Sequence, residues 1–148
     1  MATRVAMSIP VEYAFHEDSP SQHEIDLRHD NALTMADAIM TFRLIVKEVA
    51  AAQGVHATFM PKPLEGLQGS GMHLHLSLSS GDSNAFYDPD DAYNLSTIAK
   101  QFMAGLLFHA SEITAVTNQT INSYKRLVPG FEAPVHVSWA WNNRSGLI

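Results

Sequence analysis

One segment of the sequence constrains the fold more than any other, because apolar and polar side chains alternate without a break over residues 72–78. The apolar positions are Met72, Leu74, Leu76 and Leu78, and the polar positions between them are His73, His75 and Ser77. Successive side chains of a β-strand point to opposite faces of a sheet. The segment is therefore predicted to be a strand with its apolar face in the core and its two histidines on the other face.

A β-hairpin is predicted near the start of the chain. Residues 5–17 are rich in β-favouring side chains, Pro10 indicates an edge or a kink, and a Ser-Pro-Ser turn follows. In residues 23–28 the alternation places Ile25 and Leu27 on one face and charged side chains on the other. The two strands are expected to pair.

A long amphipathic helix is predicted over residues 33–53. Its apolar side chains at helical spacing are Ile39, Phe42, Val46 and Val49. Thr34, with Asp37 three residues later, resembles a capping box, and Gly54 is a natural stop.

A second helix is predicted over residues 95–117, and shorter strands over residues 56–60 and 135–141. Helices and strands in mixed order, with hairpin-like neighbours, predict an α+β fold with a mainly antiparallel sheet and helices packed on it.

Composition narrows the classes of function. The chain has 148 residues, 46% hydrophobic, a net charge of -6 and no cysteine. It lacks the basic patch of a nucleic-acid binder and an apolar run long enough to span a bilayer, so neither nucleic acid nor membrane is an expected partner. Without cysteine, disulfide and thiol chemistry are excluded, which is compatible with a cytoplasmic protein.

Eight histidines in an acidic chain invite a search for metal sites. On a strand, His73, His75 and Ser77 share one face at intervals of ~7 Å, which suits a metal ligand beside a group that contacts a nucleotide. Gly69 and Gly71 precede them and allow a ligand to approach the backbone. The alternative is a polar strand face that is merely solvated.

Two carboxylates, Glu17 and Glu24, flank the first predicted turn, so a hairpin could bring both to one side of the sheet. Mg²⁺ prefers oxygen ligands and is usually held by one or two carboxylates with water and phosphate. The alternative is a pair of exposed surface acids.

Residues 122–134 combine cations, a carboxylate, two prolines and a glycine in a predicted loop. An arginine fork matches carboxylate or phosphate oxygens, so Arg126 with Glu132 could form a substrate clamp or lid. Arg144 has the same interpretation, and for both an ordinary surface loop is the alternative.

Several motifs together resemble one known family. Residues 56–63, 69–78 and 122–134 closely resemble signature motifs of the glutamine synthetases, type I-like, in the family's order and with compatible gaps. Residues 16–24 and 143–145 also match, so the resemblance covers nearly the whole chain.

The resemblance implies roles for individual residues. Glu17 and Glu24 would hold one metal ion, on the glutamate and ammonium side of the site. His73 would hold a second, which bridges the phosphates of ATP. His75 and Ser77 would line the nucleotide site.

The remaining implied roles concern glutamate and phosphate. The loop that carries Gln68 and Gly69 would contact glutamate through its backbone, and Arg126 would bind a substrate carboxylate. Glu132 would close the site and help to deprotonate ammonium, while Arg144 would neutralise phosphate charge.

The family further implies a guanido-kinase-like catalytic domain and ATP-dependent ligation of glutamate to ammonium through γ-glutamyl phosphate. Two Mg²⁺ or Mn²⁺ ions per site, a cytoplasmic homo-oligomer, and a role in glutamine biosynthesis and nitrogen metabolism are implied with it. Residues 1–148 would be a single partial catalytic domain, without the N-terminal β domain and the C-terminal part, so the isolated chain is expected to have little activity.

Departures from the commonest pattern keep other functions open. Gln68 occupies a position where the family usually has Asn, and Glu65 occupies one that is often apolar. Residues 139–142 and Gly146 also differ from the usual family sequence. A γ-glutamylamine or polyamine ligase of the same family, and a non-catalytic metal- or nucleotide-binding module, are the alternatives. A metallohydrolase has no supporting HExxH-type or Cys-His motif.

Overall fold

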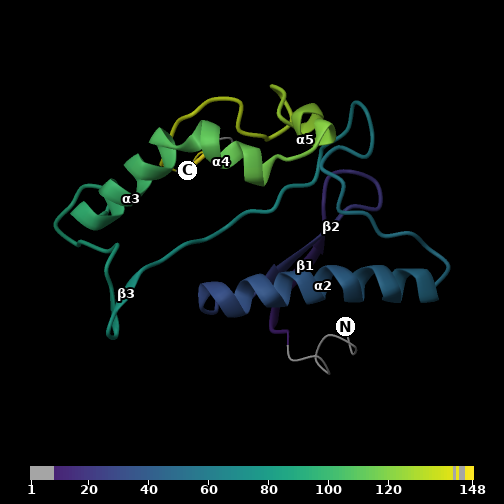
Figure 1. The fold of residues 1–148 in the computed structure, drawn as a ribbon, viewed down its shortest axis with the longest axis horizontal. Coiled ribbons are helices and arrows are strands. Elements are labelled where there is room, and N and C mark those ends of the chain that lie inside the picture. The colour runs from purple at the N-terminus through teal and green to yellow at the C-terminus, as the bar shows by residue number, and fades with distance from the viewer. Residues whose placement is uncertain (1–8, 142, 144–145) are drawn as a thin grey trace. The chain divides into compact units, whose positions relative to one another are not determined.

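The structure, a computed structural model, describes residues 9–141, 143 and 146–148. The chain divides into two compact units, Met1–Pro63 and Leu64–Ile148, and each is described by itself. Figure 1 shows the order of their elements along the chain. The described residues form helices and small antiparallel sheets, which confirms the predicted α+β class.

The predicted hairpin is the first element in the described part of the first unit. Strands β1 (Val11–His16) and β2 (His23–Leu27) pair antiparallel, with His16 opposite His23. The connecting turn is closed by a hydrogen bond from the Glu17 backbone N–H to the Gln22 carbonyl, 2.9 Å long. The hairpin prediction is confirmed for the described residues, while residues 5–8 lie outside them.

Helix α2 (Ala32–Ala52) follows the hairpin. Its N-cap is Asn31, whose side chain accepts a hydrogen bond of 3.0 Å from the Thr34 N–H, so the expected capping role of Thr34 was wrong. Asn is a stronger N-cap than Thr. The predicted stop is confirmed: Gly54 has a φ of 72°, and the N–H groups of Gly54 and Val55 bond to the carbonyls of Ala51 and Ala50, which is a Schellman motif.

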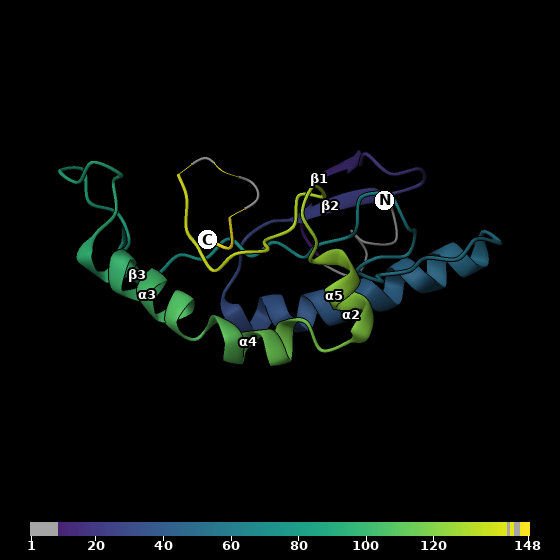
Figure 2. The ribbon, with the colours of Figure 1, turned by 90° about the horizontal axis from the view of Figure 1, so that it is seen from above.

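The core of this unit forms where the hairpin meets α2 (Figure 2). Its buried side chains are Ile9, Phe42 and Ile45, and the partly buried side chains packed against them are Ile25, Leu27, Val46 and Phe59. The rings of Phe42 and Phe59 meet edge to face, with centroids 6.2 Å apart. The face predicted to carry Ile25 and Leu27 is thus the one that packs against the core.

The described part of the second unit contains a short hairpin and three helices. Strands β3 (Ser79–Ser80) and β4 (Ser83–Asn84) pair antiparallel, and α3 (Thr97–Phe108), α4 (Ala110–Thr117) and α5 (Ile121–Arg126) follow. The long helix predicted over residues 95–117 is therefore divided in two at His109, which ends α3 and begins α4. Figure 2 shows α3 and α4 following one another along a bent path.

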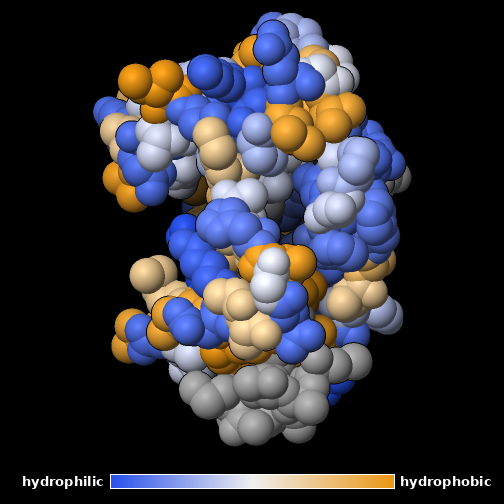
Figure 3. Space-filling model, turned by 90° about the vertical axis from the view of Figure 1, so that its right-hand side faces the viewer, coloured by the Kyte–Doolittle hydropathy of each residue, from blue (hydrophilic) through white to orange (hydrophobic). Residues whose placement is uncertain are grey.

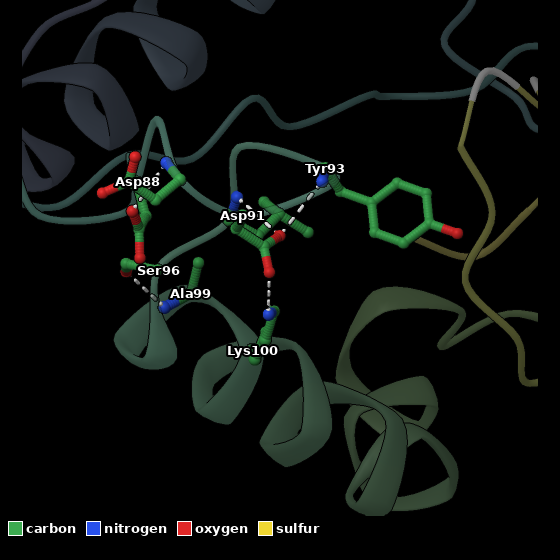
Figure 4. Close-up of polar contacts among 8 residues, drawn as sticks. Asp88, Asp91, Tyr93, Ser96, Ala99 and Lys100 are labelled. Carbon is green, nitrogen blue, oxygen red and sulfur yellow. Dashed lines mark hydrogen bonds and ion pairs between the residues drawn. The ribbon is translucent and has the colours of Figure 1, made fainter.

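Hydrogen bonds between side chains and backbone attach the loop before α3 to that helix (Figure 4). Ser96 accepts a bond from the Ala99 N–H at 3.1 Å and donates to the Ala85 carbonyl at 2.6 Å. Asp91 accepts bonds from the backbone N–H groups of Tyr93 and Leu95 and pairs with Lys100. These contacts define the start of α3.

Three predicted strands are wrong in the part of the chain that the structure describes. Residues 56–60, 72–78 and 135–141 form no ladder there. A strand exists through hydrogen bonds to a neighbour, which alternation alone does not supply. The apolar side chains expected in the core are exposed by these fractions: Met72 67%, Leu74 59%, Leu76 55% and Leu78 49%.

Large apolar side chains elsewhere also reach the surface, where Figure 3 shows hydrophobic patches among hydrophilic ones. None of the helices in the described ranges has the length and apolar character needed to cross a bilayer.

Candidate functional site

The hairpin of the first unit brings two acids together. Glu17 follows β1 and Glu24 lies in β2, and the two carboxyl groups influence each other's protonation. Burial raises the pKa of Glu24 above its ordinary value, and the contact with Glu17 and the charge of Asp26 raise it further. Nearby like charges disfavour ionisation of both groups. The structure thus brings the two predicted metal ligands together.

This pair offers two of the oxygen donors that a divalent cation would use. In the described residues, no group of three or more His, Asp or Glu side chains is arranged to hold a metal ion. Two converging carboxylates nevertheless fit Mg²⁺, which commonly takes one or two of them and completes its shell with water and substrate. A divalent cation would also relieve the repulsion between Glu17 and Glu24.

In the second unit, the glycine-rich loop meets the end of α5. A Cβ atom placed on Gly71 would lie 2.5 Å from Nη2 and 3.1 Å from Cζ of Arg126, and 3.2 Å from Nε2 of His73. The guanidinium therefore lies against the bare backbone of Gly71, with the His73 ring beside it. A predicted substrate-binding residue and a predicted metal ligand are thus neighbours.

Arg126 is held by a helix that the sequence interpretation missed. Thr120 and Ser123 form a reciprocal capping box that starts α5, within residues predicted to be a loop. A Thr-x-x-Ser box is a weaker signal than one with Glu or Gln at the fourth position. Arg126 is the last residue of α5, where the negative end of the helix dipole favours a cation.

The guanidinium of Arg126 is suited to bind an anion. It is half-buried, and burial lowers its pKa below the ordinary value. Across the described ranges, no carboxylate forms an ion pair with it. A desolvated cation without a protein counter-ion is stabilised by a bound carboxylate or phosphate.

The predicted nucleotide contacts, His75 and Ser77, follow His73 along an exposed segment. Gln68 and Gly69, the predicted glutamate contacts, are half-buried in the loop that precedes it. Arg144 lies outside the described residues.

Glu132 has an unusual backbone. Its φ of 49° is in the left-handed region, which non-glycine residues seldom adopt and which is often found at functional sites. It borders a hollow of about 410 Å³, lined by Pro129, Gly130, Glu132, Ala133, Val135, His136, Ser138 and Asn143. Sequence reasoning missed His136, because no motif marks it; its position four residues after Glu132 was the available signal.

The candidate residues divide between the units. Glu17 and Glu24 belong to the first, whereas His73, Arg126 and Glu132 belong to the second. The first unit thus offers two carboxylates, and the second offers a histidine, an arginine and a loop acid.

Comparison with known proteins identifies a consistent set of relatives. Residues 1–148 match the family described as glutamine synthetase, catalytic domain. The glutamine synthetase of Thermotoga maritima is 58% identical over 142 residues, and that of Mycolicibacterium smegmatis 60% over 142 residues; each match covers 96% of this chain and 32% of the relative. The chain thus spans about a third of the length of these curated relatives.

Solved structures agree. The cryo-EM structure of Plasmodium falciparum glutamine synthetase superposes with a TM-score of 0.93 at 40% identity, over 99% of this chain and 28% of that one. A GmaS/ADP complex superposes with a TM-score of 0.86 at 36% identity, over 99% of this chain and 35% of that one.

Proposed function

Because the chain belongs to the glutamine synthetase catalytic-domain family, we propose that it forms part of an ATP-dependent glutamate-ammonia ligase. The observation that carries the proposal is the half-buried Arg126 guanidinium, set against Gly71 and His73 without a carboxylate partner in the described residues. A carboxylate substrate fits such a group, because the planar guanidinium can donate hydrogen bonds to both of its oxygens.

In the proposed reaction, the γ-carboxylate of glutamate attacks the γ-phosphorus of ATP and ADP leaves. Ammonia then displaces phosphate from the γ-glutamyl phosphate and glutamine forms. Arg126 holds a carboxylate of glutamate in place, and the backbone near Gln68 and Gly69 approaches the same substrate. Orientation of this kind lowers the barrier because the entropy of alignment is lost on binding.

The acid pair is proposed to hold a divalent cation, Mg²⁺ or Mn²⁺, and His73 a second one. When bound, such ions neutralise charge on phosphate and carboxylate oxygens. The raised pKa of Glu24 supports this, since the charge of Glu17 that disfavours ionisation of Glu24 would be offset by a bound cation.

Glu132 is proposed to take a proton from ammonium and to exclude water from the acyl phosphate. Its left-handed backbone supports the role, because a strained conformation persists only where the surroundings maintain it. Arg144 is proposed to neutralise phosphate charge, and His75 and Ser77 to line the nucleotide site. Nucleotide binding gains support from the relative solved as an ADP complex.

The proposal includes a larger setting: a cytoplasmic, homo-oligomeric enzyme of glutamine biosynthesis, of which residues 1–148 are a partial catalytic domain. The chain alone is then expected to bind ligands but to turn over little, which an ADP-release assay on the purified chain would measure.

Glutamate binding in Mg²⁺ buffer tests the central observation. We expect the chain to bind glutamate saturably and the Arg126→Ala variant to lose roughly tenfold or more in affinity, as for a charge-assisted pair. Lys125→Ala removes the neighbouring exposed cation and should bind as the original chain does. Equal losses in the two variants, or no saturable binding by the unaltered chain, would contradict the assignment.

Catalysis can be tested in a chimaera in which this chain replaces the matching 142 residues of the Thermotoga maritima enzyme. Glutamine formation from ammonium is expected. Product with polyamines or other amines, but not with ammonium, would show a γ-glutamylamine ligase instead. A folded chimaera that is inactive with every amine would overturn the enzymatic proposal.

A further inference from the structure

Two glycines in the loop before the exposed segment meet different physical needs. Gly66 has a φ of 73° and open space where a side chain would be, so its backbone conformation explains the residue. Gly71 has no such conformation, because its φ lies outside the left-handed range. A side chain at Gly71 would instead collide with a neighbouring residue.

That residue is Arg126. A Cβ atom on Gly71 would approach Nη2 of Arg126 to 2.5 Å and Cζ to 3.1 Å, and even the second distance is shorter than ordinary van der Waals contact. The atoms in the way belong to the end of a flexible side chain, so the guanidinium, rather than the backbone, would move. The His73 Nε2 atom, 3.2 Å from the same point, restricts the directions in which it can move.

We propose that Gly71 is a positioning residue for substrate binding: its missing side chain leaves the space that seats the Arg126 guanidinium beside His73. The inference rests on the proposed function, in which Arg126 binds a glutamate carboxylate. It assigns Gly71 a role separate from backbone flexibility, because this glycine is required for the space it leaves. Any side chain at Gly71 would displace the cation from the place where it meets the substrate.

Matched substitutions test the proposal, since Gly71→Ala and Gly105→Ala each add one methyl group in the second unit. Gly105 has nothing within 4 Å of its prospective Cβ atom, so its variant controls for the loss of a glycine. We expect Gly71→Ala to weaken glutamate binding by roughly tenfold, the effect of misaligning one charge-assisted bond. Gly105→Ala should leave the affinity unchanged.

A double-mutant cycle tests whether Gly71 affects glutamate binding through Arg126. The Arg126→Ala variant has no guanidinium at this position, so adding Gly71→Ala to it should cause no further loss of glutamate affinity. A similar loss in both backgrounds would overturn the proposal, because Gly71 would then act on some other group.

A readout that needs no ligand separates this inference from the proposed function. The Arg126 Nε–Hε resonance, assigned by its disappearance in Arg126→Lys, should shift in Gly71→Ala and stay in place in Gly105→Ala. If the chain binds no glutamate but the resonance moves as expected, Gly71 does position the Arg126 guanidinium and the substrate assignment is wrong. An unmoved resonance in Gly71→Ala would show that Gly71 does not position the guanidinium.

Discussion

Different interactions stabilise the interior of each of the two compact units. In Met1–Pro63, large apolar side chains from the hairpin and α2 meet in a core around Phe42 and Ile45. In the described part of Leu64–Ile148, the buried apolar residues are alanines, namely Ala99, Ala110 and Ala133. There, hydrogen bonds around Ser96 and Asp91 hold the loop and helix together.

This difference separates two kinds of stability. A core of large side chains gains free energy in proportion to the apolar area it removes from water. A unit held by capping and turn contacts depends on individual bonds, each of which contributes only about 0.5–1.5 kcal/mol. The first unit should therefore respond to changes in packing, and the second to the loss of single polar groups.

The largest effect is expected from Phe42→Ala. Phe42 is 9% exposed and contacts Phe59, so truncation should lower the free energy of unfolding of the first unit by about 3 kcal/mol. Urea unfolding followed by amide exchange in each unit measures it. Leu44→Ala, at a position 60% exposed, should change stability by less than about 0.5 kcal/mol. Equal effects of the two variants on stability would contradict the assignment of Phe42 to the core.

A smaller effect is expected from Ser96→Ala, which removes the N-cap of α3 and should cost about 1 kcal/mol. Amide exchange should quicken in the first turn of α3 and stay unchanged in α2. Ser96→Thr keeps the capping oxygen and should preserve most of the protection. If both units loosen together in Ser96→Ala, their separate modes of stabilisation are not independent.

Gly105→Ala should stabilise α3 by about 0.5–1 kcal/mol, because alanine restricts the unfolded chain and fits the open space at this site. Gly81→Ala should do the opposite, since the φ of Gly81 is +60°. Thermal unfolding monitored by circular dichroism compares the two. Destabilisation by Gly105→Ala would mean that α3 packs against something on that face.

The smallest effects concern pH, and they differ in sign between the units. The Lys100 ammonium and the Tyr93 and Leu95 N–H groups lower the pKa of Asp91 below its ordinary value of 3.8. Its stabilising contribution is therefore present above pH 3.8 and is lost as the pH falls through the lowered value. Asp91→Asn should flatten this acid-side loss in the second unit.

Glu24 should behave in the opposite way. Burial and Glu17 raise its pKa above 4.5, so its favourable contribution is present below pH 4.5 and is lost as the pH rises through the raised value. Glu24→Gln should remove that loss in the first unit when stability is measured with a chelator present. If the contributions of Asp91 and Glu24 to stability change in the same direction with pH, the environments of the two acids are not as different as the contacts indicate.

Local signals predicted the first unit well. Alternation placed Ile25 and Leu27 on one face of the second strand, helical spacing placed Phe42 on the apolar face of the helix, and these faces meet in the core. The same alternation failed for residues 72–78, since a strand needs a partner and the described residues provide none. The helix α5 was missed because its capping box uses Ser in place of an acid or amide.

The sequence by itself determined the family and the candidate chemistry: the motifs around Glu17, His73, Arg126 and Glu132 can be read without coordinates. Only the tertiary structure decided that Glu17 raises the pKa of Glu24, that Glu132 has a left-handed backbone, and that Arg126 lies against Gly71 beside His73. Residues 71 and 126 are far apart along the chain, so no periodicity or local propensity relates them. Their contact is set by where α5 ends and by the absence of one methyl group.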